Sequence, residues 1–147
     1  MHNRYSPQNI ADCTMGIIQN KLGGGRICVA GYSPWSFNET LSKSSQLKTV
    51  FQWLSHDRLP GYIESYHKIN LWIRETQEGN TTLAFVNSSF DAAENVVLAL
   101  NTDKNKIKVV NMDCEEQVIS ARKEEGKYKQ FIIPTVDPWQ ILLICTE

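Results

Sequence analysis

Apolar and polar residues alternate in the second half of this chain, and this alternation constrains the fold more than any other feature. Between His67 and Glu75 every second residue is apolar: Ile69, Leu71 and Ile73. The residues between them are polar apart from one tryptophan: Lys68, Asn70, Trp72 and Arg74. The same period of two continues in Leu83 and Phe85 and again in Val96, Leu98 and Leu100. Because side chains of a strand point alternately to its two faces, the pattern predicts half-buried β-strands.

Turn residues separate these strands from four further extended segments. Residues 106–112 predict a strand, residues 118–123 and 127–133 predict a hairpin closed by Glu124, Glu125 and Gly126, and residues 140–146 predict a closing strand. Gly126 can adopt the positive φ that a tight hairpin turn requires. About seven short strands with turns between them predict an antiparallel β-sandwich over residues 61–147.

Residues 1–60 have a different pattern. We expect a helix over residues 7–22, a strand over residues 26–30 and a second helix over residues 42–56, capped by Ser42 and ended before Pro60. The second helix places Leu47, Val50, Phe51 and Leu54 on one face. The strand is apolar on both faces, as a buried central strand would be, and residues 1–60 offer no second strand of that type. This segment is therefore expected to be an incomplete α/β unit, which needs upstream sequence, another chain or the sandwich to pair with.

Composition excludes several classes of function. With 147 residues, 41% hydrophobic and 21% charged, the chain has enough apolar residues for an ordered core. A net charge of -1 argues against nucleic acid or a membrane surface as a partner, and no apolar run reaches the ~20 residues of a membrane helix. The composition predicts no particular cellular compartment. Cys28 and Cys145 lie in apolar runs and are expected to be buried free thiols. Three Asn-x-Ser/Thr triplets begin at Asn38, Asn80 and Asn87.

No residue pattern predicts catalysis. Ser33 follows a strand, as a nucleophile does in a Gly-x-Ser-x-Gly turn, but Trp35 stands where that turn needs its second glycine. Cys28 lies within its strand and has no visible base beside it. The glycines 23–25 precede the strand, which is the wrong side for binding phosphate. The three histidines are far apart in sequence, so we expect no metal and no cofactor.

Sugar chemistry is a stronger candidate. A glycosidase needs two facing carboxylates, yet nothing ranks one pair above another among Glu64, Glu75, Glu78, Asp91, Asp113, Glu115 and Glu116. Trp72 is predicted on the polar face of its strand between Asn70 and Arg74, where an exposed indole could stack on a pyranose ring. Tyr32 and Trp35 are a second aromatic candidate. The alternative is that Trp72 covers a domain interface, while Trp53 and Trp139 are expected to be packing residues.

Five segments, in order along the chain, resemble the C-terminal region of glycoside hydrolases of the β-galactosidase type, family 42 and its relatives. They are GGGRICVAGYSPW (23–35), SSQLKTVFQWLSHDRLPG (44–61), INLWIRE, LAFVNSS and IIPTVDPWQILLI (132–144). In that family a catalytic barrel is followed by an amidotransferase-like α/β domain without amidotransferase activity and then by a small β-sandwich. The resemblance implies that residues 1–60 are the end of the α/β domain. It also implies an accessory role, because the catalytic glutamates of the family belong to the barrel.

Three hypotheses follow. The chain is a non-catalytic accessory segment of a glycoside hydrolase that serves interdomain packing or oligomerisation, with the upstream catalytic domain or another copy of the chain as its partner. Alternatively, it is a carbohydrate-binding module that uses exposed aromatic residues. The third hypothesis is a small free-standing enzyme with an unrecognised site.

Overall fold

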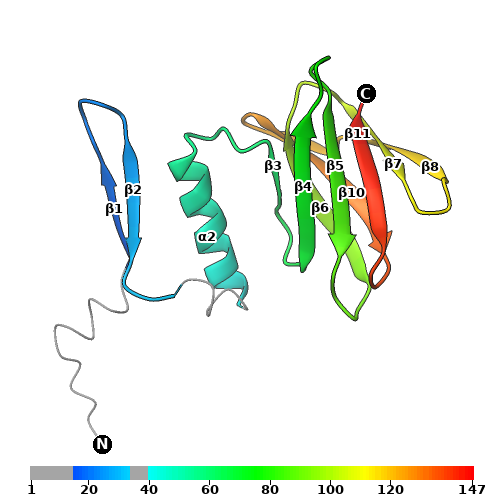
Figure 1. Ribbon diagram of the computed structural model, residues 1–147, viewed down its shortest axis with the longest axis horizontal. Helices are drawn as coiled ribbons and strands as arrows, with labels where there is room; N and C mark the ends of the chain where they lie inside the picture. The colour runs from blue at the N-terminus through cyan, green and yellow to red at the C-terminus, as the bar shows by residue number, and fades with distance from the viewer. Residues whose placement is uncertain (1–14, 34–39) are drawn as a thin grey trace, which may run out of the picture. The chain divides into compact units, whose positions relative to one another are not determined.

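The computed structural model describes residues 15–33 and 40–147. The chain divides into two compact units, Met1–Asp57 and Arg58–Glu147 (Figure 1). The described elements are antiparallel β-sheets and one helix, so the chain is mainly β. Among the described residues, no helix is long and apolar enough to cross a membrane.

A two-stranded hairpin forms the sheet of the first unit. Strand β1 (Met15–Gln19) pairs antiparallel with β2 (Arg26–Ala30), with Ile18 opposite Ile27 and Gly16 opposite Val29. Gly24 has a φ of 67°, which a residue with a side chain rarely adopts, so the glycine-rich segment forms the hairpin loop. The prediction of a helix over residues 7–22 is wrong for residues 15–19, which form a strand. Residues 7–14 lie outside the described part of the chain.

The expectations for strand 26–30 were also wrong. The strand has a partner, β1, within the first 60 residues. It is not buried on both faces, since Ile27 and Val29 each keep 59% of their surface exposed. An apolar sequence alone therefore did not identify a central strand of a parallel sheet.

The helix α2 (Leu41–Leu54) begins one residue before Ser42, and its N-cap is Thr40 rather than Ser42. The Thr40 hydroxyl accepts a hydrogen bond from the Lys43 amide over 3.4 Å, which satisfies one of the free N–H groups of the first turn. At the other end of the helix, the Arg26 guanidinium donates to the Trp53 carbonyl and lies 5.0 Å from the centre of the Trp53 ring. The described order in this unit is strand, strand, helix, and not the helix, strand, helix that the sequence predicted.

The second unit contains two antiparallel sheets. One has the order β3 (Gly61–Ile63), β6 (Ala93–Asn101), β10 (Tyr128–Val136) and β9 (Lys123–Glu125). The other has the order β4 (Ile69–Glu75), β5 (Thr81–Asn87), β11 (Ile141–Thr146), β7 (Lys106–Val110) and β8 (Glu116–Ser120). Figure 1 shows β4, β5 and β11 in one layer and β6 and β10 behind them. The prediction of about seven strands was wrong, because the sheets hold four and five strands.

One hydrophobic core lies between these sheets. The five-stranded sheet contributes Leu83, Phe85, Ile107 and Ile144, and the four-stranded sheet contributes Val96, Leu98, Phe131 and Ile133. Ile69, Leu71 and Ile73 of β4 are half-buried and pack against the same core. The half-buried strands predicted from the alternation are thereby confirmed, because the apolar residues of β4, β5 and β6 face the core and the residues between them do not.

The predicted hairpin of residues 118–133 was partly wrong. Its turn is confirmed, since Gly126 has a φ of 62° and β9 pairs with β10. The segment before the turn, however, is divided between the two sheets. The Ala121 amide donates to the carbonyl of Asn105, just before β7, and the next amide, Arg122, donates to Gln130 of β10. The chain thus changes sheets within two residues, which a period of two cannot reveal.

Candidate functional site

The outer face of the five-stranded sheet carries apolar side chains in a row across four strands. Trp72, Ala84, Leu143 and Val110 are direct neighbours in the strand register, and we call them the apolar stripe. Trp72 is 59% exposed and Leu143 is 53% exposed. Three more apolar residues lie on the same outer face: Val86, Ile141 and Val118. Sheet faces in contact with water usually carry polar residues, so this face requires an explanation.

Polar side chains border the apolar stripe: Asn70, Arg74, Thr82, Lys108 and Glu116. The Lys108 ammonium lies 3.3 Å from a Glu116 carboxylate oxygen and 3.4 Å from one of Glu147. The hydrogen bond to Glu116 and then the one to Glu147 raise the pKa of Lys108 above its ordinary value of 10.5. The face therefore has an apolar centre and a charged edge.

The residues predicted to bind sugar fall into two groups. Trp72, Asn70 and Arg74 share the outer face of β4, and all three are exposed. The Asn70 amide donates to the Ser88 hydroxyl over 2.9 Å. Tyr32 belongs to the first unit, where its ring lies 5.2 Å from the Lys43 ammonium. Trp35 lies outside the described residues.

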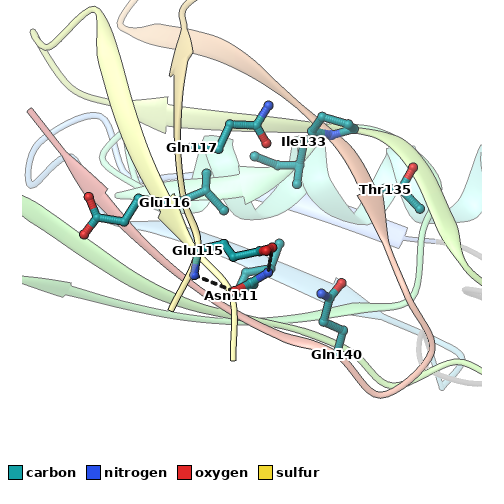
Figure 2. A pocket seen from close by; sticks show the side chains of 10 residues that line it. Asn111, Glu115, Glu116, Gln117, Ile133, Thr135 and Gln140 are labelled. Atoms are coloured by element: carbon teal, nitrogen blue, oxygen red, sulfur yellow. Dashed lines mark hydrogen bonds between the residues drawn. The ribbon is translucent and has the colours of Figure 1, made fainter. Parts of the chain in front are cut away.

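A cleft of about 510 Å³ lies in the second unit (Figure 2). Its lining combines the apolar residues Val109, Ile133, Pro134 and Leu142 with the polar residues Asn111, Glu115, Glu116, Gln117, Thr135 and Gln140. The Asn111 amide donates to the Glu115 carboxylate over 2.8 Å, and the Glu115 main-chain N–H donates to the Asn111 side-chain oxygen over 2.9 Å. This pair is fixed in the loop between β7 and β8.

The two carboxylates of the cleft are not arranged as an acid and base pair. Figure 2 shows the Glu116 carboxylate directed away from Asn111 and Glu115, and that carboxylate pairs with Lys108. Glycoside hydrolysis needs two carboxylates that face each other across the sugar. The cleft can accept and donate hydrogen bonds to a polar ligand, but Glu115 and Glu116 do not converge on one point in it.

The other nucleophile and ligand candidates are not among the residues that line the cleft. Ser33 is exposed in the first unit, where Cys28 is half-buried. Cys145 is also half-buried, so the expectation of buried thiols was wrong for both cysteines. Within residues 15–33 and 40–147, no group of three or more His, Cys, Asp or Glu side chains is placed to hold a metal ion.

Two aromatic residues that the sequence analysis did not identify as a site lie together on the surface. Trp139 was predicted to be a packing residue, which is wrong, because it is 59% exposed. Its ring meets that of Phe90, which is 85% exposed, with 5.6 Å between ring centres and an angle of 82° between ring planes. We call these two residues the aromatic corner. Pro138 signals the turn that carries Trp139, but no local pattern brings Phe90 beside it.

Comparison with known proteins gives no match to this chain among protein-family models, curated proteins or solved structures.

Proposed function

We propose that this chain is a non-catalytic accessory segment of a β-galactosidase-type glycoside hydrolase, and that its second unit is a β-sandwich that packs against another protein surface. The packing surface is the outer face of the five-stranded sheet, centred on the apolar stripe. Its partner is the upstream catalytic domain of the same protein or another copy of this chain.

The exposure of Trp72 on the edge strand β4 and of Leu143 on the central strand β11, in one row across the sheet face, is the observation that carries this proposal. Leaving a large apolar side chain in water instead of burying it costs about 1.5–3 kcal/mol. Protein interfaces have this arrangement, with an apolar centre and a polar edge. The charged edge formed by Arg74, Lys108 and Glu116 would orient the partner without lying at the centre of the contact.

A carbohydrate-binding role for the same face is the second candidate. The exposed Trp72 between Asn70 and Arg74 favours it. Two observations argue against it. The residues of the apolar stripe beside Trp72 are aliphatic, and the Asn70 amide already donates a hydrogen bond to the Ser88 hydroxyl. Aliphatic neighbours suit a protein partner better than a sugar, whose hydroxyl groups would lie over them without hydrogen bonds.

Two measurements test the accessory role. The first is the reading frame upstream of Met1: continuous coding for a barrel domain supports the proposal, and an in-frame stop codon next to Met1 contradicts it. The second is sedimentation of the chain, alone and with the barrel domain that the frame encodes. We expect Leu143→Glu to abolish the association, because it places a carboxylate in the apolar stripe.

The matched control is Ser120→Glu, which adds the same charge on the same sheet face but outside the apolar stripe. It should leave the association unchanged. A chain that stays monomeric and does not bind the barrel contradicts packing through this face, and so does an association that Leu143→Glu leaves intact. The carbohydrate alternative predicts retardation of the chain in polysaccharide gels that Trp72→Ala removes.

A further inference from the structure

We propose that the aromatic corner, Phe90 with Trp139, is a binding site for a pyranose ring of a neutral carbohydrate. This site lies on two loops at one end of the second unit and shares no residue with the apolar stripe. The inference therefore stands or falls separately from the packing function proposed above.

The buried side chain of Asn87 holds both loops in place. Asn87 is 1% exposed, and its amide donates to the carbonyl of Asp91 in the β5–β6 loop over 2.9 Å. The same amide donates to the carbonyls of Val136 and Asp137, at the start of the β10–β11 turn, over 2.9 and 3.2 Å. Its side-chain oxygen accepts from the Ser89 amide over 3.0 Å. The residues on either side of Phe90 and the start of the turn that carries Trp139 are thus fixed to one group.

The main chain of Asn87 completes this connection. Its carbonyl accepts from the Trp139 amide over 2.8 Å, and its N–H donates to the Gln140 carbonyl over 3.1 Å. The Gln140 side chain in turn accepts from the Asp137 amide over 2.9 Å. A site whose aromatic residues are held before the ligand arrives loses less entropy on binding, which favours binding.

Trp139 occupies a backbone conformation that its own side chain does not favour. Gln140 donates to the Asp137 carbonyl over 3.1 Å, so Pro138 and Trp139 are the central residues of a β-turn, and Trp139 has a φ of 62°. Turns of this kind usually have glycine or asparagine at that position. Glycine or asparagine would form this turn without that strain, and most of the tryptophan side chain is exposed, so we assign it a role in recognition.

The ring geometry leaves room for a flat apolar ligand. An edge-to-face pair places the edge of one ring on the face of the other, so the two rings meet at a corner. Exposed fractions of 85% for Phe90 and 59% for Trp139 show that most of the surface of both side chains is open. A pyranose has C–H groups on one face and hydroxyl groups at its edge, so it can stack on an aromatic ring while its hydroxyls contact polar neighbours.

The charges of the two loops restrict the ligand further. Residues 88–92 and 137–140 carry the exposed carboxylates of Asp91 and Asp137 and no lysine or arginine. Carboxylates repel nucleic acid phosphates and anionic membrane surfaces, which basic side chains would attract. They accept hydrogen bonds from hydroxyl groups. These features favour an uncharged ligand with an apolar face and hydroxyl donors, which describes a neutral sugar.

The test uses the full chain and Trp139→Asn, because asparagine tolerates the positive φ and removes the ring. The chain is run through native gels that contain β-1,4-galactan, galactomannan or xyloglucan. We expect retardation in at least one gel and about tenfold weaker binding for Trp139→Asn and for Phe90→Ala, the loss expected for one aromatic contact. Glu78→Gln, in the turn at the other end of β5, is the control and should bind as the unmodified chain does.

Nuclear magnetic resonance gives a second readout that does not depend on polymer length. The indole N–H signal of Trp139 is assigned by its absence in Trp139→Asn, and methyl β-galactopyranoside is then added. We expect this signal to shift, and glycerol, which has hydroxyls but no ring, should not shift it. No retardation in any gel together with no shift overturns the proposal. Retardation that survives Trp139→Asn and is lost in Trp72→Ala also overturns it, and so does an equal shift with glycerol.

Discussion

The Asn87 side-chain amide donates a hydrogen bond of 2.9 Å to the Val136 carbonyl, and this contact joins the end of β5 to the end of β10 across the two sheets of the second unit. The same amide reaches Asp91 and Asp137. One buried polar group thus connects the core, a loop and a turn.

The burial of Asn87 also bears on the Asn-x-Ser triplet that begins there. The side-chain nitrogen of Asn87 is buried and hydrogen-bonded in the folded chain, so this nitrogen is not accessible to a glycosylating enzyme.

Asn87→Asp should destabilise the second unit by about 3 kcal/mol or more, because a buried carboxylate would face three carbonyl oxygens in place of an N–H donor. Burial raises the pKa of a carboxyl, so the unfolding free energy of this variant should increase as pH falls through that pKa. Urea unfolding at several pH values measures both effects. Asn80→Asp, at the half-buried Asn80 of a turn, should change stability by only about 0.5 kcal/mol. Equal losses in the two variants would contradict the role given to Asn87.

Gly61→Ala should destabilise the second unit by about 1–3 kcal/mol through overpacking. A Cβ at Gly61 would lie 2.6 Å from a Leu100 methyl and 2.8 Å from the Ala99 carbonyl oxygen, and the carbonyl cannot move without shifting β6. Thermal unfolding of the variant measures the loss. Gly25→Ala is the control, because a Cβ there would meet nothing within 4 Å. A Gly61→Ala protein as stable as the parent would mean that β3 does not approach β6 as closely as described.

Much of the second unit was predictable because its strands have one face toward the core and one face away from it. Alternation identified the core positions of β4, β5 and β6. The three-residue strand β3 is too short to show a period, and β8 and β9 read as one strand because the change of sheet at Ala121 and Arg122 depends on hydrogen bonds to distant segments. In the first unit, the segment 7–22 that was predicted to be a helix includes the strand β1.

The candidate surfaces were less predictable than the core. Trp72, Asn70 and Arg74 were placed correctly on one face by their spacing alone. The apolar stripe needs the register of four strands, which no single strand encodes. The aromatic corner combines residues 49 positions apart in the chain, brought together by Asn87. Contacts between distant segments define both surfaces, and local sequence patterns do not report such contacts.

Lys108→Met should lower stability at neutral pH by removing both ion pairs of this residue. The folded state raises the pKa of Lys108 above 10.5, so the contribution is fully present below about pH 10.5 and is lost as pH rises through the folded pKa. The difference in unfolding free energy between parent and variant should therefore shrink in alkaline solution. Lys106→Met, at an exposed lysine on the same strand, is the control. A difference that grows above pH 10.5 would contradict the assigned ion pairs.

Trp139→Asn and Trp139→Val should differ in stability even though both remove the indole and its contact with Phe90. At a φ of 62°, asparagine is tolerated, whereas a β-branched residue is strained by about 1–2 kcal/mol. We therefore expect the asparagine variant to unfold at a higher urea concentration than the valine variant, with an unfolding free energy larger by about 1–2 kcal/mol. The asparagine variant should be about as stable as the parent chain. Urea unfolding of the three proteins measures this order. If Trp139→Asn were much less stable than the parent, Trp139 would be a packing residue and its assignment to recognition would fail. If the valine variant were more stable than the asparagine variant, the turn would not have the backbone conformation described.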